Sequence, residues 1–476
     1  MKKKNKKINL VGKIIGIISI ILIIIFSVLL VKLNMIPTKY LLILMIILFL
    51  LYLILTFFAF NKKIKAKLKI TAIIILTIFG VISGFGTKYL LSTINFMDII
   101  DKDVFQKERF MIKVLNSSEF KELNNLKNKS IGSYKTSNSA KASKELSKKI
   151  NYIQKEYNNL DALFEDLTNG NLSAILISSS VEKILEDEYE NINSTLKTIY
   201  EFKISIEHED IVKVVNVTNT PFNVYIAGGD GYGSIDAIFN TDVNMVATID
   251  PINRKVLLTS IPRDYYVNLV GQGPNAYDKL THAGYYGIQE SVKTIENLLN
   301  IDINYYVKVN FSTIEGVVNA IGGVDVYSDY DFYERAFNKY HFTVGTNHLN
   351  GEQALAFARE RKSFADGDVQ RVKNQQKVVE AIIKKVTSST SLITNYDQIL
   401  NSISENMDTN MPSKDISRLV KMQLNDMRGW TIESQNATGT GQMGPTYTFP
   451  TLELYTMKPD EESVTSIKAK IQEYLK

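Results

Sequence analysis

Seven polar side chains between residues 230 and 375 have the types and spacing expected of a site for phosphate chemistry. They are two carboxylates, four arginines and an amide: Asp230, Asp242, Arg263, Arg359, Arg361, Arg371 and Gln375. Two carboxylates at one rim can share a hard cation, and Mg2+ suits a site with few carboxylates and several phosphate oxygens. Guanidinium groups match phosphate geometry with two parallel hydrogen bonds and stay charged. The set therefore indicates a magnesium-dependent oxyanion site.

The two carboxylates and the first arginine lie at the ends of predicted strands. Asp230 follows one strand after two glycines, Asp242 shortly precedes the next, and Arg263 follows the third. The three strands are 223–227, 244–250 and 255–261. Sheets of α/β proteins form their ligand crevices at strand ends, so we expect these three side chains to meet.

The remaining four side chains lie on two predicted elements. Arg359 and Arg361 are two residues apart, which in an extended segment points both guanidinium groups to one side. Arg371 and Gln375 are four apart in a helix predicted over 369–386, so they share a face. Taken singly, each arginine is more simply a surface ion pair and each aspartate a turn cap. Only the set as a whole favours a binding site.

Other catalytic chemistries lack their residues in this sequence. The chain has no cysteine, which excludes thiol nucleophiles, disulfides and cysteine-ligated metals. Its four histidines, which are His208, His282, His341 and His348, do not have the spacing of an HExxH metal site. A G-x-S-x-G nucleophile elbow and a Walker A loop are also missing, and we interpret the glycines of AGGDGYGS as a turn.

Short apolar runs alternate with helical patterns from residue 222 to the C-terminus. Besides the three strands above, the runs predict strands at 305–309, 324–327, near 430 and at 452–457. The helical patterns cover 288–299, 314–321, 369–386 and 416–427. This alternation is typical of an α/β sandwich with a partly parallel sheet.

Residues 95–207 are rich in Lys, Glu, Asn and Ser, and their sparse apolar residues predict a small α/β accessory domain. The expected strands are 110–114 and 172–177, and the expected helices are 141–157 and 181–198. The order of elements loosely resembles one lobe of an extracellular solute-binding domain. Since no cluster of ligand-reading residues is evident, we expect a spacer or a protein-contact domain.

Residues 1–92 predict a membrane anchor. Three apolar runs, 11–31, 40–60 and 70–91, approach the about 20 residues that a helix needs to cross the hydrocarbon core. All 14 charged residues of this segment are lysines, concentrated before the first run and between the second and third. By the positive-inside rule the N-terminus is cytoplasmic and the chain beyond the third run is extracytoplasmic. That larger part carries 41 basic and 50 acidic residues, so it is net acidic although the whole chain is +5.

Several separated motifs in the same order resemble the LytR-CpsA-Psr family of cell-wall enzymes. They are SIPRDYYV, YDKLTHAGYYG, IGGVDVY, HLNGEQALAFARERKS and GDVQRVKNQQKVV. Three spans followed by an accessory domain are similar to the streptococcal capsule-biosynthesis branch of this family. The resemblance implies an α/β/α sandwich of the family type with a mixed central sheet. This sandwich is expected to be the catalytic domain and to cover 222–476. Three transmembrane helices (1–92) and the accessory domain (95–207) are expected to precede it.

The resemblance also implies a role for each residue of the site. Asp230 and Asp242 match the family's catalytic carboxylates that bind Mg2+. The family's catalytic and pyrophosphate-binding set corresponds to Arg263, Arg359, Arg361, Arg371 and Gln375. This chain has Asn240 where the family has arginine, two residues before the second carboxylate. A charge-assisted phosphate contact is worth about 1.5–3 kcal/mol, so we expect slower transfer unless Lys279 or His282 compensates.

Members of the family are membrane-anchored phosphotransferases. The resemblance therefore implies that the chain moves a glycopolymer, such as capsular polysaccharide or teichoic acid, from polyprenyl pyrophosphate to peptidoglycan through a phosphodiester. The expected cofactor is Mg2+, and the expected partners are the lipid-linked polymer, peptidoglycan and the membrane, with no nucleic acid. A muramic acid 6-hydroxyl is the expected acceptor, and Asp368 is a supporting residue for an unassigned base.

The polyprenyl tail needs an apolar slot, which three amphipathic helices can line: 288–299, 314–321 and 378–386. The apolar face of such a helix more often faces the protein core. Two other functions stay open at this point. One is a pyrophosphatase that hydrolyses polyprenyl pyrophosphate. The other is a non-catalytic regulator that binds lipid-linked saccharide.

Overall fold

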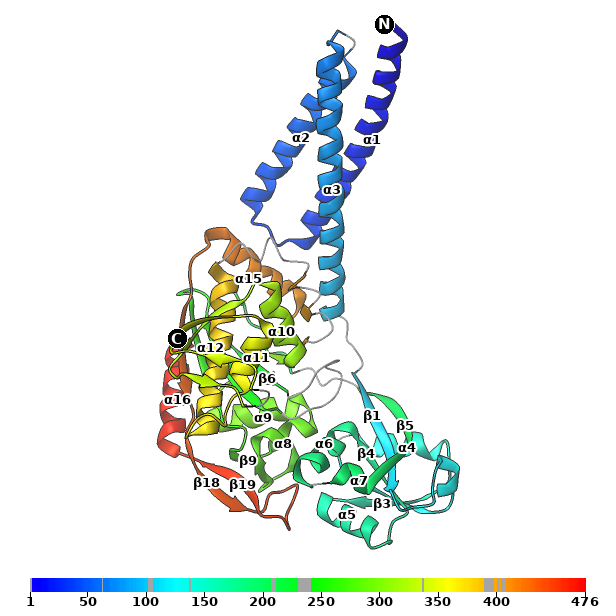
Figure 1. The fold of residues 1–476 in the computed structure, drawn as a ribbon, viewed down its shortest axis with the longest axis vertical. Coiled ribbons are helices and arrows are strands. Elements are labelled where there is room, and N and C mark those ends of the chain that lie inside the picture. Colours follow the sequence, from blue (N-terminus) through cyan, green and yellow to red (C-terminus); the bar gives the residue numbers. More distant parts are fainter. Residues whose placement is uncertain are drawn as a thin grey trace. The chain divides into compact units, whose positions relative to one another are not determined.

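The computed structural model describes residues 2–61, 63–101, 106–136, 138–189, 191–206, 211–229, 241–335, 338–388, 398–399, 402–403 and 407–476 (Figure 1). It divides into two compact units. One consists of Met1–Lys102 and Pro412–Arg428, and the other of Asp103–Met411 and Gly429–Lys476. The first unit holds the predicted membrane helices, and the second holds the sheets.

Three long helices form most of the first unit. They are α1 (Lys2–Leu33), α2 (Thr38–Phe60) and α3 (Ala66–Asp101). Each contains a stretch long and apolar enough to cross a membrane, with at most 28% of that stretch buried. Apolar helix surface exposed to this extent is stable in lipid rather than in water, and the prediction of three membrane helices is confirmed. Helix α3 extends beyond the predicted run 70–91, because hydropathy marks the lipid-facing part of a helix and not its end.

A fourth helix of this unit comes from the C-terminal part of the chain. It is α15 (Ser413–Asp426), which matches the predicted helix 416–427. Hydrogen bonds join α15 to one end of the bundle. Asp101 accepts from Ser413 N at 2.8 Å (Oδ1) and from Ser413 Oγ (Oδ2). Lys421 Nζ donates to Asn34 Oδ1 at 3.0 Å, and Lys39 Nζ donates to Asn425 O at 3.5 Å. This end is opposite to the lysine-rich turn between α2 and α3.

In the second unit, residues 106–206 form a mixed five-stranded sheet with its helices, which we refer to as the accessory region. In spatial order its strands are β3 (Ile153–Tyr157), β2 (Ser130–Tyr134), β4 (Ala174–Ser178), β1 (Gln106–Leu115) and β5 (Leu196–Ile206). Its helices are η1 (Leu123–Leu126), α4 (Ser139–Ser147), α5 (Leu160–Thr168), α6 (Ser179–Glu188) and α7 (Ile192–Thr195). Strand β2 is parallel to both neighbours, whereas β1 is antiparallel to both of its own.

Of the two helices predicted in the accessory region, one is wrong in its second half and the other is a strand only in its last three residues. The predicted helix 141–157 begins as α4 but ends as the edge strand β3, which pairs with β2. Leu146, Ile150 and Ile153 have helical spacing, but backbone pairing with the neighbouring strand overrides this local pattern. The predicted helix 181–198 likewise gives way after α6 and α7 to β5, because β5 pairs with β1 along its length.

The rest of the second unit, from residue 222 onward, is the sandwich region and is built on a mixed six-stranded sheet. In spatial order its strands are β16 (Met407–Thr409), β11 (Tyr305–Val309), β6 (Phe222–Gly228), β7 (Val243–Asp250), β8 (Lys255–Ile261) and β17 (Thr431–Asn436). Strands β6, β7 and β8 form an antiparallel meander, and β11 and β17 add to it in parallel. The predicted mixed central sheet is confirmed.

Helices cover both faces of this sheet, so that β8 is buried along nearly its whole length. On one face α9 (Ile288–Leu299) and α16 (Glu461–Tyr474) share a core with Tyr225, Leu257 and Ile261. Helix α12 (Gly367–Ser388) packs on β8 and β17, where Gln376 Nε2 donates to the main-chain oxygen of Gln435 at 2.8 Å. Helices α10 (Phe311–Ala320) and α11 (Gly351–Arg359) pack against α12.

Short strand pairs and turns complete the sandwich region. They are β9 (Tyr266–Asn268) with β10 (Tyr277–Lys279), β12 (Val324–Ser328) with β15 (Gly345–Leu349), β13 (Phe332–Tyr333) with β14 (His341–Phe342), β18 (Gly439–Gly444) with β19 (Leu454–Pro459), and the helices η2 (Val270–Gln272), α8 (Leu280–Ala283) and η3 (Gly284–Tyr286). The predicted strand 324–327 forms as β12, but it pairs outside the central sheet.

The core under α9 makes a test of the fold. Ile295 is fully buried in this core, whereas Leu298 on the same helix is half-buried. Ile295→Ala should cost about 2–5 kcal/mol of stability, because it removes buried carbon and leaves a cavity. Leu298→Ala is the matched control and should cost less. Thermal unfolding of the full chain in detergent compares the two, and a larger loss for Leu298→Ala would contradict the described packing.

Candidate functional site

Strands β7 and β8 place Asp242 opposite Arg263. In the antiparallel ladder Asn244 pairs with Ile261, and continuing this register by two residues brings the two charged side chains face to face. Arg263 Nη1 donates to Asp242 Oδ1 at 2.7 Å. The two side chains are only 27% and 15% exposed, so their attraction is less screened by water than in a surface ion pair.

A second arginine joins this site from the first turns of α12. Arg371 Nη2 lies 2.8 Å from Asp368 Oδ1, and its side chain is 11% exposed. Burial lowers the pKa of Arg371, and the charges of Arg263 and Arg361 lower it further. Asp368 and Asp242 act in the opposite direction without outweighing these effects. The charges of all three arginines therefore lie in one electrostatic neighbourhood.

Both Arg263 and Arg371 keep a buried N–H group without a hydrogen-bond acceptor among the described residues. Burial lowers the pKa of Arg263, but Asp242 and Asp264 outweigh burial and raise it above its ordinary value. The Nε groups of Arg263 and Arg371 are buried and make no hydrogen bond to the part of the chain that the structure describes. A buried donor without an acceptor costs about 1–3 kcal/mol, more when it is charged. These N–H groups are therefore suited to receive the oxygens of an anionic ligand.

Arg359 and Arg361 flank a buried glutamate. Residues 359–361 were predicted to be extended, but Arg359 is the last residue of helix α11. Glu360 is 5% exposed, and its carboxylate accepts hydrogen bonds from two main-chain amides. Both arginines are exposed on either side of this anchor, and the Arg359 guanidinium lies 4.2 Å from the ring centroid of Phe311. Glu360 is the residue that sequence reasoning missed in this motif.

The three other residues predicted or discussed for the site are Gln375, Asp230 and Asn240, and the structure describes only the first. Gln375 is half-buried on α12, one turn after Arg371. Asp230 and Asn240 lie outside the described residues, so Asp242 alone represents the predicted metal ligands. Within the described ranges, no three histidine or carboxylate side chains gather as a metal site. A single carboxylate with phosphate oxygens still fits the ordinary coordination of Mg2+.

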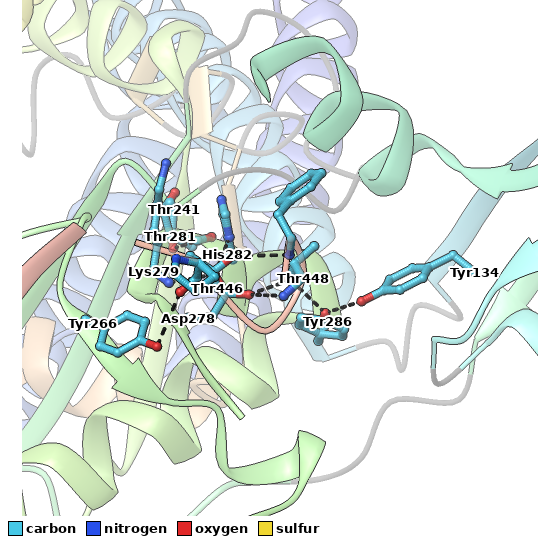
Figure 2. A network of polar contacts seen from close by, with 12 residues as sticks. Tyr134, Thr241, Tyr266, Asp278, Lys279, Thr281, His282, Tyr286, Thr446 and Thr448 are labelled. Atoms are coloured by element: carbon cyan, nitrogen blue, oxygen red, sulfur yellow. Dashed lines mark hydrogen bonds and ion pairs between the residues drawn. The ribbon is translucent and has the colours of Figure 1, made fainter. Parts of the chain in front are cut away.

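A buried polar network beside Arg263 was not predicted from the sequence (Figure 2). Thr281 N donates to the main-chain oxygen of Arg263 at 2.8 Å, and Thr241 Oγ1 lies 3.5 Å from Thr281 O. Asp278 Oδ1 lies 2.6 Å from His282 Nδ1. The only sequence signal is the spacing of four between this aspartate and histidine inside YDKLTHAGYYG.

The aspartate and histidine of this network are buried together. Burial raises the pKa of Asp278, but His282 and Thr448 outweigh burial and hold that pKa below its ordinary value. The His282 side chain is 2% exposed and packs against the rings of Tyr285 and Phe449. A ring so enclosed is not exposed to a ligand from outside. His282 is therefore part of the framework that surrounds Arg263.

Comparisons with known proteins identify the family of the chain. Residues 187–463 match the family model of LytR_cpsA_psr. The polyisoprenyl-teichoic acid–peptidoglycan teichoic acid transferase TagU of Bacillus anthracis is 37% identical over 225 residues, which cover 47% of this chain and 71% of that protein. The protein of the same name from Enterococcus faecalis is 34% identical over 55% of this chain and 82% of its own. The crystal structure of B. subtilis TagV is 32% identical, covers 54% of this chain and 98% of its own, and gives a TM-score of 0.46. With more than half of its length matched by the family model, the chain belongs to the LytR-CpsA-Psr family.

Proposed function

We propose that this chain is a membrane-anchored phosphotransferase that moves a glycopolymer from a polyprenyl-pyrophosphate carrier to peptidoglycan through a phosphodiester. The observation that carries the proposal is the pair of half-buried arginines Arg263 and Arg371, whose buried Nε groups make no hydrogen bond to the described residues; Asp264 Oδ2 lies 3.6 Å from Arg263 Nε. Transferase activity on a cell-wall glycopolymer follows from the family. The names of the relatives give teichoic acid as the transferred group and peptidoglycan as the acceptor.

The charge balance of the site supports Mg2+ as the cofactor. Three carboxylates already neutralise much of the positive charge of three arginines: Asp242, Asp264 and Asp368 with Arg263, Arg361 and Arg371. A dianionic pyrophosphate entering this site adds negative charge that the arginines alone do not offset. Mg2+ held by Asp242, together with Asp230, would supply the missing positive charge and polarise phosphate oxygens. Asp242, which accepts a hydrogen bond from Arg263, would be the described carboxylate that holds the cation.

In the proposed reaction a hydroxyl of peptidoglycan attacks the phosphorus next to the glycopolymer. The bond from that phosphorus to the bridging oxygen breaks, and polyprenyl phosphate leaves with the bond's electron pair. The hydroxyl proton passes to a base that stays unassigned. Arg263 and Arg371 spread the charge that develops on the leaving phosphate, which is the main requirement in phosphoryl transfer. Asp368 supports this role because it orients Arg371.

The first experiment tests whether the guanidinium group of Arg263 binds the pyrophosphate. Arg263→Lys keeps the charge but loses the paired donors, so it should weaken the binding of inorganic pyrophosphate with Mg2+ about 10–100-fold. Isothermal titration calorimetry on the full chain in detergent measures this change. Arg109→Lys is the matched control, because Arg109 is a partly exposed arginine of the accessory region with two carboxylates 3.7 Å away. Equal losses in both variants would contradict the assignment.

The metal role of Asp242 is the second test. Asp242→Asn should reduce transfer of labelled polymer from polyprenyl pyrophosphate to peptidoglycan fragments about a hundredfold, because it removes a ligand of Mg2+. Binding of pyrophosphate in EDTA should not weaken, since the substitution removes a carboxylate that competes for Arg263. Weaker binding in EDTA with unchanged transfer would overturn the metal role. Consumption of the lipid substrate without acceptor fragments would identify a pyrophosphatase instead.

The topology of the anchor is also part of the proposal, with the N-terminus cytoplasmic and the sandwich region extracytoplasmic. The lysines near the α2–α3 turn support it, as does the contact of α15 with the opposite end of the bundle. The chain has no cysteine, so single introduced cysteines report their own side. A membrane-impermeant maleimide should label Lys203→Cys in intact cells and should label Asn61→Cys only after the membrane is opened. The reverse pattern would overturn this topology.

A further inference from the structure

The loop 446–451 is held from two sides by carboxylates of different regions. Asp278 Oδ2, in the sandwich region, accepts from Thr448 N at 2.9 Å and from Thr448 Oγ1 at 2.5 Å. Asp161 Oδ2, in the accessory region, accepts from Thr451 N at 3.0 Å and from Thr451 Oγ1 at 2.5 Å. The same two-point contact, an amide and a hydroxyl on one oxygen, thus occurs twice on one loop.

Both carboxylates are buried, and their second oxygens have partners as well. Asp161 is 7% exposed, and its Oδ1 accepts from Tyr189 OH at 2.9 Å. Asp278 is fully buried, and its Oδ1 accepts from Lys279 N at 2.7 Å and lies beside His282. A buried charge that loses a hydrogen-bond partner is strongly destabilised, so neither carboxylate can release the loop without cost. The loop is therefore fixed to both regions at once.

A pair of tyrosines adds a second bridge between the regions (Figure 2). Tyr134 OH, from β2 of the accessory region, lies 2.6 Å from Tyr286 OH, which in turn lies 3.1 Å from Thr448 Oγ1. Tyr285 and Phe449 belong to the same apolar core as the leucines of α5 in the accessory region. The core of the accessory region therefore continues into the segment that contains Asp278.

This segment holds the backbone around Arg263. Leu280 N donates to Tyr265 O at 2.8 Å, and Thr281 N donates to Arg263 O at 2.8 Å. Both donors follow Asp278 by no more than three residues. A shift of Asp278 would therefore move the hydrogen bond to the main chain of Arg263 and the one to Tyr265, two residues later.

We propose that the accessory region is a working part of the catalytic site, with Asp161 and Tyr134 as positioning residues. They hold loop 446–451 and Tyr286, which hold Asp278, and the segment after Asp278 sets the position of the Arg263 guanidinium. This inference rests on the proposed phosphotransferase function. Displacements of about 1 Å at a reacting centre can cost a hundredfold in rate, so a remote clamp of this kind has a kinetic consequence.

Asp161→Asn in the full-length protein tests the proposal, with Asp166→Asn as the matched control. Both aspartates lie on α5, but Asp166 bonds only within the accessory region among the described contacts, to Tyr157 and Asn171. Asp161→Asn should lower kcat about tenfold with little change in KM. Hydrogen exchange should speed up at the amides of Thr451, Thr448 and Thr281, while β2 stays protected. Asp166→Asn should change none of these values.

Each other outcome overturns the proposal in a separate way. Unchanged exchange at Thr281 would show that the clamp does not reach Arg263. Faster exchange with unchanged kcat would show a contact without a positioning role. If Asp161→Asn also removes the protection of β2, the accessory region has lost its fold, and Tyr134→Phe becomes the test. This variant removes one hydroxyl, should keep the fold and should lower kcat. An unchanged kcat in Tyr134→Phe would contradict the proposal. Hydrogen exchange needs no substrate, so it reports on these contacts even if the unmodified chain shows no transfer. An absence of transfer in the unmodified chain would refute the proposed function and not the contacts.

Discussion

The antiparallel register of β7 and β8 is the constraint on which the site depends. It sets Asp242 opposite Arg263, and a slip of one residue would send one of the two side chains to the other face of the sheet. Helix α12 is placed on the same strand, because Gln376 contacts the main chain of Leu258 five residues after Arg371. One buried strand therefore sets the positions of both arginines that keep donors without acceptors.

The contacts of Asp161 and Tyr134 show that the accessory region is bound to the sandwich region by buried polar groups. A spacer needs little more than length, whereas this region directs a buried carboxylate and a buried hydroxyl at its neighbour. Buried polar groups of this kind specify one arrangement over others when all their partners are present. These contacts join the accessory region to the sandwich region of the same chain.

Local patterns predicted the membrane helices, five of the six strands of the central sheet and the placing of Asp242 and Arg263 at strand ends, but they missed the short edge strand β16. They failed at β3, where helical spacing was overridden by pairing with β2. They also did not reveal the role of Asp161, whose partner Thr451 lies 290 positions later in the chain. Hydrophobic periodicity reports which face of an element is buried, but it does not report which distant element covers it. Contacts of this type become visible only once both regions are folded.

Helix α15 joins a late segment of the chain to the three apolar helices. It is hydrogen-bonded to the end of α3, and short connections join it to β16 on one edge of the central sheet and to β17 on the other. Spans that are too long for a thin bilayer tilt to keep their apolar surface in lipid. Such a tilt would move α15 as well, because α15 belongs to the same compact unit as the three apolar helices. A segment that follows most of the sandwich region in the sequence is thus part of the unit that contacts lipid.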